Sequence, residues 1–182
     1  MIGIFNRSYY EEVLVAKVHP EIVLRQNLSH IGKVSDITNS FWHERYAQIN
    51  NYEQRLHTNG IKVIKFFLHL SKKEQAKRFL KRFKREDKNW KFSESDMKER
   101  AYWDDYQKAY EKCIQMTSKT HAPWHIIPAD HKWFMRALVS QIIVDEINSL
   151  SPKYPILDKE AKSHLEIARK QIEIELGLEQ KS

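Results

Sequence analysis

Residues 61–75 decide the fold class, and they read Ile-Lys-Val-Ile-Lys-Phe-Phe-Leu-His-Leu-Ser-Lys-Lys-Glu-Gln. The first eight are apolar at both parities except at Lys62 and Lys65, which is typical of a central parallel strand covered on both faces. Ser71 and Glu74 follow with the spacing of a capping box that begins a helix. The stretch therefore predicts a strand that leads directly into a helix, the unit of a parallel α/β fold.

The same reasoning extends in both directions along the chain. Further strands are predicted at residues 2–5 and 124–127, and a second capping box spans Ser8 to Glu11. Helices are predicted at about 39–57, with Phe41, Ile49, Tyr52 and Leu56 on one face, at 72–88, from Ser93 onward as one long helix, from Asp130 to about 147, and at about 158–176. We therefore expect an α/β fold with a parallel sheet and right-handed crossovers. Because the chain opens on a core strand, we expect it to be the C-terminal portion of a larger doubly wound domain.

The length of 182 residues fits one domain with an appendage. We expect the domain to cover residues 1–155 and a C-terminal helical appendage to cover 156–182. Ile167, Ile174 and Leu178 give the appendage an apolar stripe among mixed charges, so we expect it to dock on its own sheet or on a second subunit. This favours a homo-oligomer.

Composition limits the function classes. There are 31 Lys and Arg residues against 24 Asp and Glu, which gives a net charge of +7 and a pI of about 9.3. Such a balance favours a polyanionic partner: nucleic acid, polyphosphate or nucleotides. None of the 4 glycines are spaced for a phosphate-binding or dinucleotide-binding glycine loop, so side chains must hold any phosphate. A single cysteine, Cys113, fits a reducing compartment, and with no secretory signal or membrane-spanning run we expect a cytoplasmic protein.

Two groups of side chains are candidates for a site. Asn6, Arg7 and Ser8 follow the first predicted strand, where ligands bind in open α/β sheets. The alternative is that Asn6 and Ser8 only cap a helix and that Arg7 is surface charge. The second group is the segment 72–88, with nine basic and three acidic residues; its arginines Arg78, Arg82 and Arg85 recur at helical spacing and suit phosphate oxygens. The alternative there is a solvated charged face.

Aromatic residues raise a further pair of alternatives. Trp90 and Phe92 flank Lys91, and the set Trp103, Tyr106, Tyr110 and Cys113 forms a stripe at three- and four-residue steps. Such rings could stack a nucleobase. The alternative is that the stripe belongs to the hydrophobic core.

Five motifs in this order resemble the type 2 polyphosphate kinases, over residues 1–155. They are Gly-Ile-Phe-Asn-Arg-Ser-Tyr-Tyr-Glu-Glu-Val-Leu-Val (3–15), Phe-Phe-Leu-His-Leu-Ser-Lys-Lys-Glu-Gln (66–75), Lys-Asn-Trp-Lys-Phe-Ser (88–93), Tyr-Trp-Asp-Asp-Tyr (102–106) and His-Ala-Pro-Trp-His-Ile-Ile-Pro-Ala-Asp (121–130). The resemblance implies a P-loop-kinase fold that transfers a phosphoryl group between polyphosphate and a nucleoside mono- or diphosphate, with Mg²⁺.

The resemblance also implies roles for individual residues. Residues 5–9 match the family's second phosphate and metal motif, so Arg7 would clamp a phosphate, with Ser8 beside it, and Asn6 would offer an amide oxygen to Mg²⁺. An Asn at this position looks like the subgroup that accepts both AMP and ADP. Residues 71–100 match a mobile lid, in which Arg78 and Arg82 would close over the transferring group and Lys91 and Arg100 would bind phosphate.

The sequence departs from the family at one point. Family members begin with a strand and a glycine-rich Walker A loop that holds an Asp and a Lys, and the sequence contains no such motif. We therefore expect a chain truncated at its N-terminus, with little activity alone. Two alternatives stay open: a non-catalytic module that binds polyphosphate or nucleic acid, and an ATP-using nucleoside monophosphate kinase.

Overall fold

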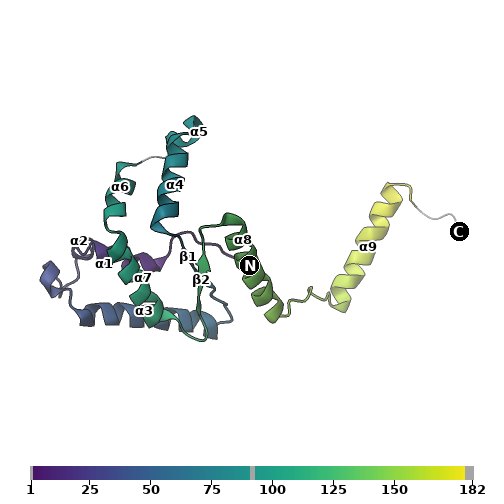
Figure 1. Ribbon diagram of the computed structural model, residues 1–182. Helices are drawn as coiled ribbons and strands as arrows, with labels where there is room; N and C mark the ends of the chain where they lie inside the picture. Colours follow the sequence, from purple (N-terminus) through teal and green to yellow (C-terminus); the bar gives the residue numbers. More distant parts are fainter. Residues whose placement is uncertain (1, 91–92, 179–182) are drawn as a thin grey trace. The chain divides into compact units, whose positions relative to one another are not determined.

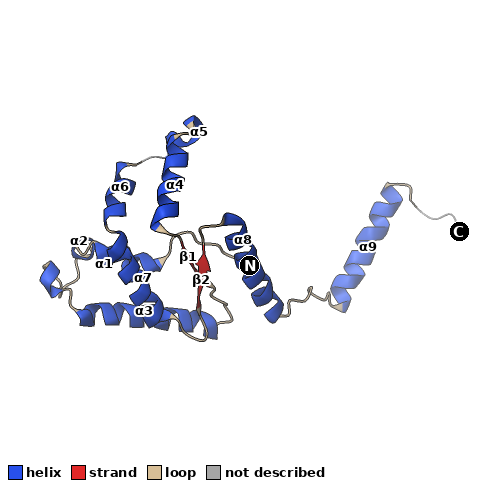
Figure 2. Ribbon diagram, viewed as in Figure 1, coloured by secondary structure: helices blue, strands red, loops and turns tan. Residues whose placement is uncertain are grey.

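Two parallel strands, β1 (Lys65–His69) and β2 (Trp124–Pro128), form the sheet of the computed structural model, which describes residues 2–90 and 93–178. Lys65 pairs with Trp124 at one end and His69 with Pro128 at the other. Helices make up most of the rest (Figure 2). The predicted α/β class and the parallel pairing are confirmed. The first strand begins at Lys65 and not at residue 61, because its partner begins at Trp124 and Pro123 before it has no N–H to donate.

The chain divides into two compact units, Met1–Ile143 and Val144–Ser182. The first unit opens with short helices, followed by the 20-residue α3 (Figure 1). These elements are η1 (Tyr9–Glu12), α1 (Val15–Val18), α2 (Glu21–Leu24), η2 (Val34–Asp36) and α3 (Asn39–Thr58). The prediction of a helix at about 39–57 is confirmed. The helix ends at Asn59, and Gly60 takes the left-handed conformation at φ +77°, which glycine adopts without strain.

In the described part of the connection from β1 to β2, the helices are α4 (Lys72–Phe83), α5 (Glu86–Asn89), α6 (Glu94–Ala101) and α7 (Trp103–Thr117). The predicted start at Ser71 is confirmed, since its Oγ accepts a hydrogen bond from the Glu74 amide at 3.1 Å. The predicted helix over 72–88 is instead divided in two, because α4 ends at Phe83 and α5 begins at Glu86. The helix predicted from Ser93 is broken at Tyr102, whose ring lies edge-on against His19.

The C-terminal helices are α8 (Lys132–Ser149) and α9 (Lys159–Glu175). Both match the sequence prediction, and Asp158 caps α9 by accepting a hydrogen bond from the Ala161 amide at 2.8 Å. Asp130 does not open α8 as predicted, because its carboxylate accepts a hydrogen bond from the Ser71 amide at 2.8 Å. Among the described residues, no helix is both long and apolar enough to cross a bilayer.

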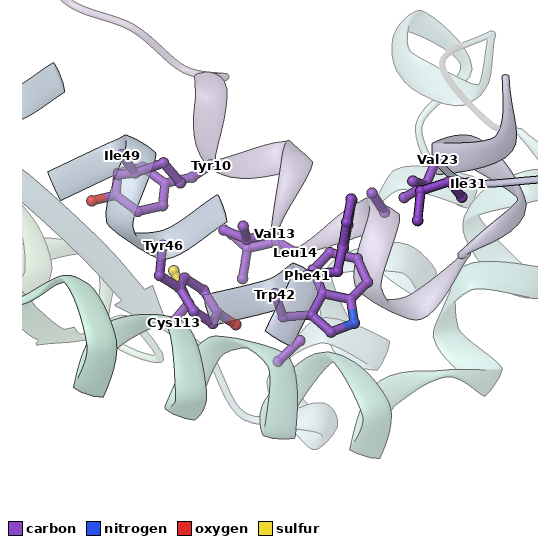
Figure 3. Packing of buried hydrophobic residues seen from close by; sticks show 12 residues of the cluster. Tyr10, Val13, Leu14, Val23, Ile31, Phe41, Trp42, Tyr46, Ile49 and Cys113 are labelled. Carbon is purple, nitrogen blue, oxygen red and sulfur yellow. The ribbon is translucent and has the colours of Figure 1, made fainter. Parts of the chain in front are cut away.

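The hydrophobic core of the first unit lies among the helices rather than around the sheet (Figure 3). Its buried residues come from η1, α1, α2, α3, α7 and the loop after α2: Tyr10, Val13, Leu14, Ala16, Val23, Ile31, Phe41, Trp42, Tyr46, Ile49, Ala109 and Cys113. The buried face of α3 also includes Glu53, whereas Tyr52, placed on the predicted face, is 50% exposed. The hydrophobic pattern thus located the helix and two residues of its inner face, Phe41 and Ile49, but placed Tyr52 on that face wrongly.

The predicted strand at residues 2–5 is wrong. The segment forms no strand, and its apolar side chains are exposed, Ile4 by 91% and Phe5 by 83%. A strand exists only where another strand accepts its hydrogen bonds, and no described strand pairs with this segment. The expectation that β1 is covered on both faces is also wrong. Leu68 on β1 is 47% exposed, and Ile126 on the neighbouring β2 is 57% exposed.

Candidate functional site

The carboxyl ends of β1 and β2 are joined by side chains from the loops that follow them. The Ser71 amide donates to the Asp130 carboxylate at 2.8 Å, and this backbone hydrogen bond is the main cause of a lowered pKa at Asp130. Arg78 lies at the same edge, where its Nη2 donates to the carbonyls of Ala129 at 2.6 Å and Asp130 at 3.1 Å. Its Nε also donates to Glu74 at 3.1 Å. The predicted residue Arg78 is therefore fixed at the edge where parallel sheets bind ligands.

A pocket of about 310 Å³ opens between β1, α4, α6 and α7. Its lining combines apolar rings with charged groups: Phe67, Leu68, Leu70, Gln75, Phe79, Asp96, Glu99, Arg100, Trp103, Tyr106, Gln107 and Tyr110. Arg100 connects α6 to α4 through hydrogen bonds to the Gln75 side chain and, at 3.0 Å, to the Lys72 carbonyl. Arg82 lies over the Phe79 ring and pairs with Asp96 at 3.6 Å. Two predicted residues, Arg82 and Arg100, thus adjoin one pocket.

The aromatic stripe of α7 is divided between the core and this pocket. Cys113 is fully buried, and Tyr110 stacks on Phe67 with 4.5 Å between ring centroids. Trp103 and Tyr106 line the pocket, and the Tyr106 hydroxyl donates to Glu99 at 2.7 Å. The outcome lies between the two alternatives, since one end of the stripe is core and the other is available to a ligand.

Glu99 forms the polar wall of the pocket. Its carboxylate accepts from Tyr106 and lies 2.9 Å from Nε2 of His19. Burial acts to raise the pKa of Glu99, but the hydrogen bonds from Tyr106 and His19 outweigh it, and the pKa is lowered. The pKa of Tyr106 is raised by burial and by the neighbouring Glu99 charge. Glu99 is thus held as a carboxylate whose lone pairs are directed at residues of this chain.

The N-terminal candidates lie on the exposed segment before η1. Arg7 pairs with Glu11 at 2.8 Å, and its side chain is 80% exposed. The Ser8 hydroxyl caps η1 by accepting from the Tyr10 amide at 3.4 Å. Asn6 is exposed.

A buried polar cluster connects η1, α3 and β1, and it was not predicted from the sequence. Glu53 of α3 is 0% exposed and accepts hydrogen bonds from the hydroxyls of Tyr9 and Tyr10, both at 2.8 Å. Lys65 of β1 donates to Glu53 at 2.6 Å, to the Tyr10 hydroxyl at 2.9 Å and to the Thr117 carbonyl at 2.9 Å. Two signals could have indicated it: a glutamate on the inner face of a helix, four residues after Ile49, and a lysine inside an apolar strand.

The predicted site residues form two groups in the structure. One group lies at α4 and the pocket, with Arg78 and Arg82 on α4 and Arg100 on α6. The other group, Asn6, Arg7 and Ser8, lies before η1. Lys91 lies outside the described residues. Among the residues that are described, no three or more His, Cys, Asp or Glu side chains gather to hold a metal.

Comparison with known proteins places this geometry in a family. The polyphosphate kinase 2 family model matches residues 1–155. An ADP-polyphosphate phosphotransferase from Rhodopseudomonas palustris is 54% identical over 157 residues, covering 85% of this chain and 52% of that protein. An AMP/ADP-polyphosphate phosphotransferase from Meiothermus ruber is 41% identical over 152 residues, covering 84% of this chain and 51% of that protein.

A solved structure agrees with these matches. The crystal structure of polyphosphate kinase 2 from Arthrobacter aurescens TC1 superposes with a TM-score of 0.77 at 37% identity, covering 92% of this chain and 55% of that one. The chain spans about half the length of the curated relatives it matches. The matched range includes every predicted site residue, and on these grounds the chain belongs to the polyphosphate kinase 2 family.

Proposed function

We propose that this chain takes part in phosphoryl transfer between inorganic polyphosphate and AMP or ADP. The observation that carries the proposal is the family match over residues 1–155, which includes both groups of candidate side chains. In the reaction, the terminal P–O–P bond of polyphosphate breaks, and the released phosphoryl group bonds to a phosphate oxygen of the acceptor nucleotide. When the reaction runs in reverse, the donor is the product nucleotide, which is ADP if AMP was the acceptor and ATP if ADP was the acceptor.

The proposed roles follow from charge and position. Phosphoryl transfer needs little covalent help from the protein and depends on positioning and on neutralising the oxygens of the transferring group. Arg78, held at the sheet edge, and Arg82, beside the pocket, would act on that group. Arg7 would clamp a second phosphate, with Asn6 and Ser8 beside it. Lys91 and Arg100 would bind the polyphosphate chain.

Magnesium is part of the proposal as a component brought with the phosphates. Mg²⁺ in such sites is commonly held by one or two carboxylates together with substrate phosphates and water. Among the described residues, no cluster of three or more His, Cys, Asp or Glu side chains is placed to hold a metal, and Asn6 would add one neutral oxygen. No step of the proposal is therefore assigned to the metal.

We further propose that the isolated chain turns over slowly or not at all. No glycine-rich loop with its lysine is present in the sequence, and loss of a single preorganised donor costs about 10² to 10³ in rate in other enzymes. The test incubates the purified chain with polyphosphate, Mg²⁺ and AMP or ADP and measures the nucleotide products. We expect none above background, and we expect turnover when a family segment with the Walker A loop is supplied by fusion. Strong turnover by the chain alone, abolished by Arg7→Ala, would contradict the proposal that turnover depends on the Walker A segment.

A second candidate function is a non-catalytic module that binds polyphosphate or nucleic acid. The observation that favours it is the surface of α4, where Lys72, Lys73, Lys77 and Lys81 are all exposed. Salt-sensitive binding of polyphosphate with no turnover, even in the fused form, would support this function. Turnover with ATP as the donor, but not with polyphosphate, would instead support an ATP-using monophosphate kinase.

The C-terminal helix and the cellular setting belong to the same proposal. We propose that residues 156–182 are an appendage that docks on the sheet or on a second copy in a homo-oligomer, and that the protein acts in the cytoplasm. Leu165, Ile172 and Ile174 on α9 are each more than half exposed, and an isolated helix of this length is marginal in water. Truncation after Pro155 should lower the thermal midpoint or the oligomeric mass. If both stay unchanged, the appendage does not dock.

A further inference from the structure

The buried cluster around Glu53 joins the two segments that carry the candidate site. Tyr9 and Tyr10 directly follow Arg7 and Ser8 in the chain, and both hydroxyls donate to Oε1 of Glu53. Lys65 stands at the start of β1, whose other end leads through His69 to Ser71 and α4. The Glu53–Lys65 ion pair, at 2.6 Å, therefore links the segment that carries the N-terminal candidates to the strand whose carboxyl end leads to Arg78.

The ammonium of this pair uses all three of its protons, and the carboxylate accepts hydrogen bonds on both of its oxygens. The three protons of the Lys65 ammonium go to Glu53, to the Tyr10 hydroxyl and to the Thr117 carbonyl. The Glu53 carboxylate receives Tyr9 and Tyr10 on one oxygen and Lys65 on the other. Buried charges are tolerated only when they are paired and hydrogen-bonded in this way, so the geometry of the cluster is specified closely.

The segment before η1 has little else to fix it among the described residues. Ile4 and Phe5 are exposed, and the ion pair of Arg7 with Glu11 is local and on the surface. Consecutive Cα atoms are about 3.8 Å apart, so fixing Tyr9 limits Arg7, two residues earlier, to a small volume. The ring of Tyr9 is itself confined by Tyr10 at 5.0 Å and by Tyr52 at 5.2 Å between centroids.

We infer that the Glu53–Lys65 pair is a positioning device, which acts through the hydroxyls of Tyr9 and Tyr10 to hold Asn6, Arg7 and Ser8 at a set distance from the sheet edge. The role of this distance in phosphate binding rests on the proposed function. The positioning itself is a property of the free chain and can be measured without a ligand. Glu53 and Lys65 are positioning residues and touch no substrate. A purely structural role predicts a different result, because a general loss of stability would affect all core helices equally.

The test removes only the two hydroxyls, in the Tyr9→Phe/Tyr10→Phe variant of the full chain. The matched control is Tyr154→Phe, since Tyr154 is 96% exposed. Amide hydrogen exchange is followed across residues 6–12 and across α7, and the dissociation constant for polyphosphate is measured with and without Arg7→Ala. We expect exchange over 6–12 to rise at least about tenfold, which is the scale of losing one hydrogen bond to a charged acceptor, and exchange in α7 to stay unchanged.

For binding, we expect the double variant to weaken polyphosphate affinity several-fold, and we expect this effect to vanish when Arg7 is already alanine. Equal loss with and without Arg7, or unchanged exchange over 6–12, would overturn the inference. If the unmodified chain binds no polyphosphate, the proposed function fails, and the exchange result alone decides the positioning. If the double variant does not fold by circular dichroism, Tyr9→Phe replaces it, because Tyr9 lies at the margin of the cluster.

Discussion

Two ion pairs in this molecule have similar chemistry and opposite surroundings. Glu53 and Lys65 pair among the core helices with side chains 0% and 5% exposed, whereas Arg82 and Asp96 pair between α4 and α6 with side chains 38% and 39% exposed. If one partner is removed, the remaining charge of the buried pair stays shielded from water and is strongly destabilised. The remaining charge of the exposed pair is hydrated by solvent. The comparison indicates that the buried pair fixes the structure around it, whereas the exposed pair can be replaced by water and salt at little cost.

The helices around these pairs differ in the same sense. Five residues of α3 are buried, including Trp42 and Tyr46, and α4 has none. The α4 helix is attached by polar contacts instead, chiefly those of Arg78 to the carbonyls after β2 and of Arg100 to Gln75 and Lys72. A helix attached in this way can move when an anion competes for its arginines. This is the property expected of the lid segment at residues 71–100.

The largest expected effect comes from breaking the buried pair. Glu53→Ala leaves the Lys65 ammonium desolvated without a counter-charge, and removal of one partner of a buried pair costs about 3–5 kcal/mol of the free energy of unfolding. Urea denaturation followed by circular dichroism measures the loss. The matched control is Asp96→Ala, which breaks the exposed pair and should cost about 0–1 kcal/mol. Equal losses in the two variants would mean that burial does not separate these regions.

The next effect concerns local opening of the free protein. Amides in α4 should exchange by small local openings, whereas amides in α3 should exchange only through openings near the full stability of the unit, which for a domain is at least about 5 kcal/mol. The protection factors should therefore differ by about 10² to 10³, measured by hydrogen exchange with mass spectrometry. Equal protection in α3 and α4 would contradict the assignment of a mobile lid.

A smaller effect is expected when charge is removed from the lid. Arg78→Ala/Arg82→Ala should weaken polyphosphate binding by about 10- to 100-fold and reduce the slope of log K against log salt by about 1.4–1.8, by analogy with lysine and arginine contacts to nucleic acid phosphates. Because Arg78 also holds the carbonyls of Ala129 and Asp130, Arg82→Ala alone serves as the control that leaves this anchor intact. An unchanged salt slope in both variants would remove these arginines from the phosphate site.

The parts of the fold that the sequence predicts well are those set by local chemistry. Ser71 and Asp158 cap helices by their own side chains within three residues, and Gly60 ends α3 by its own conformational freedom. These signals need no knowledge of the rest of the chain. The helices they bound were accordingly placed within one or two residues at these ends.

The parts that the sequence did not predict depend on distant partners. Residues 2–5 have the composition of a strand, but a strand needs a neighbour, and composition does not say whether one is present. Glu53 is buried because Lys65, Tyr9 and Tyr10 surround it, and Lys65 lies 12 residues away in the chain. Arg78 was a predicted site residue, yet the Ala129 carbonyl that fixes it lies 51 residues further on. Residue type and spacing therefore suggest candidate residues, but they do not identify the distant partners that position them.

The smallest expected effect sharpens the comparison from the side of the core. Burial raises the pKa of the Cys113 thiol to about 12, from an ordinary value of 9.0. A group whose pKa is higher in the folded state stabilises the fold below its unfolded pKa, and this contribution is lost as the pH rises toward the folded pKa. Between pH 7 and pH 10 the loss in the free energy of unfolding should be about 1.4 kcal/mol. At pH 10 the pH is one unit above the pKa of the unfolded thiol, which is therefore mostly ionised, while the folded thiol stays protonated.

The measurement compares urea denaturation of the unmodified chain and of Cys113→Ala at pH 7 and pH 10. The alanine variant loses stability at both pH values because a cavity replaces the sulfur, and tyrosines and lysines titrate alike in the two proteins. Each protein loses some stability between pH 7 and pH 10, and this loss should be larger in the unmodified chain. The difference between the two losses is the contribution of the thiol. Equal pH dependence would mean that Cys113 reaches water in the native state. The region that we describe as fixed by packing would then open as readily as the lid.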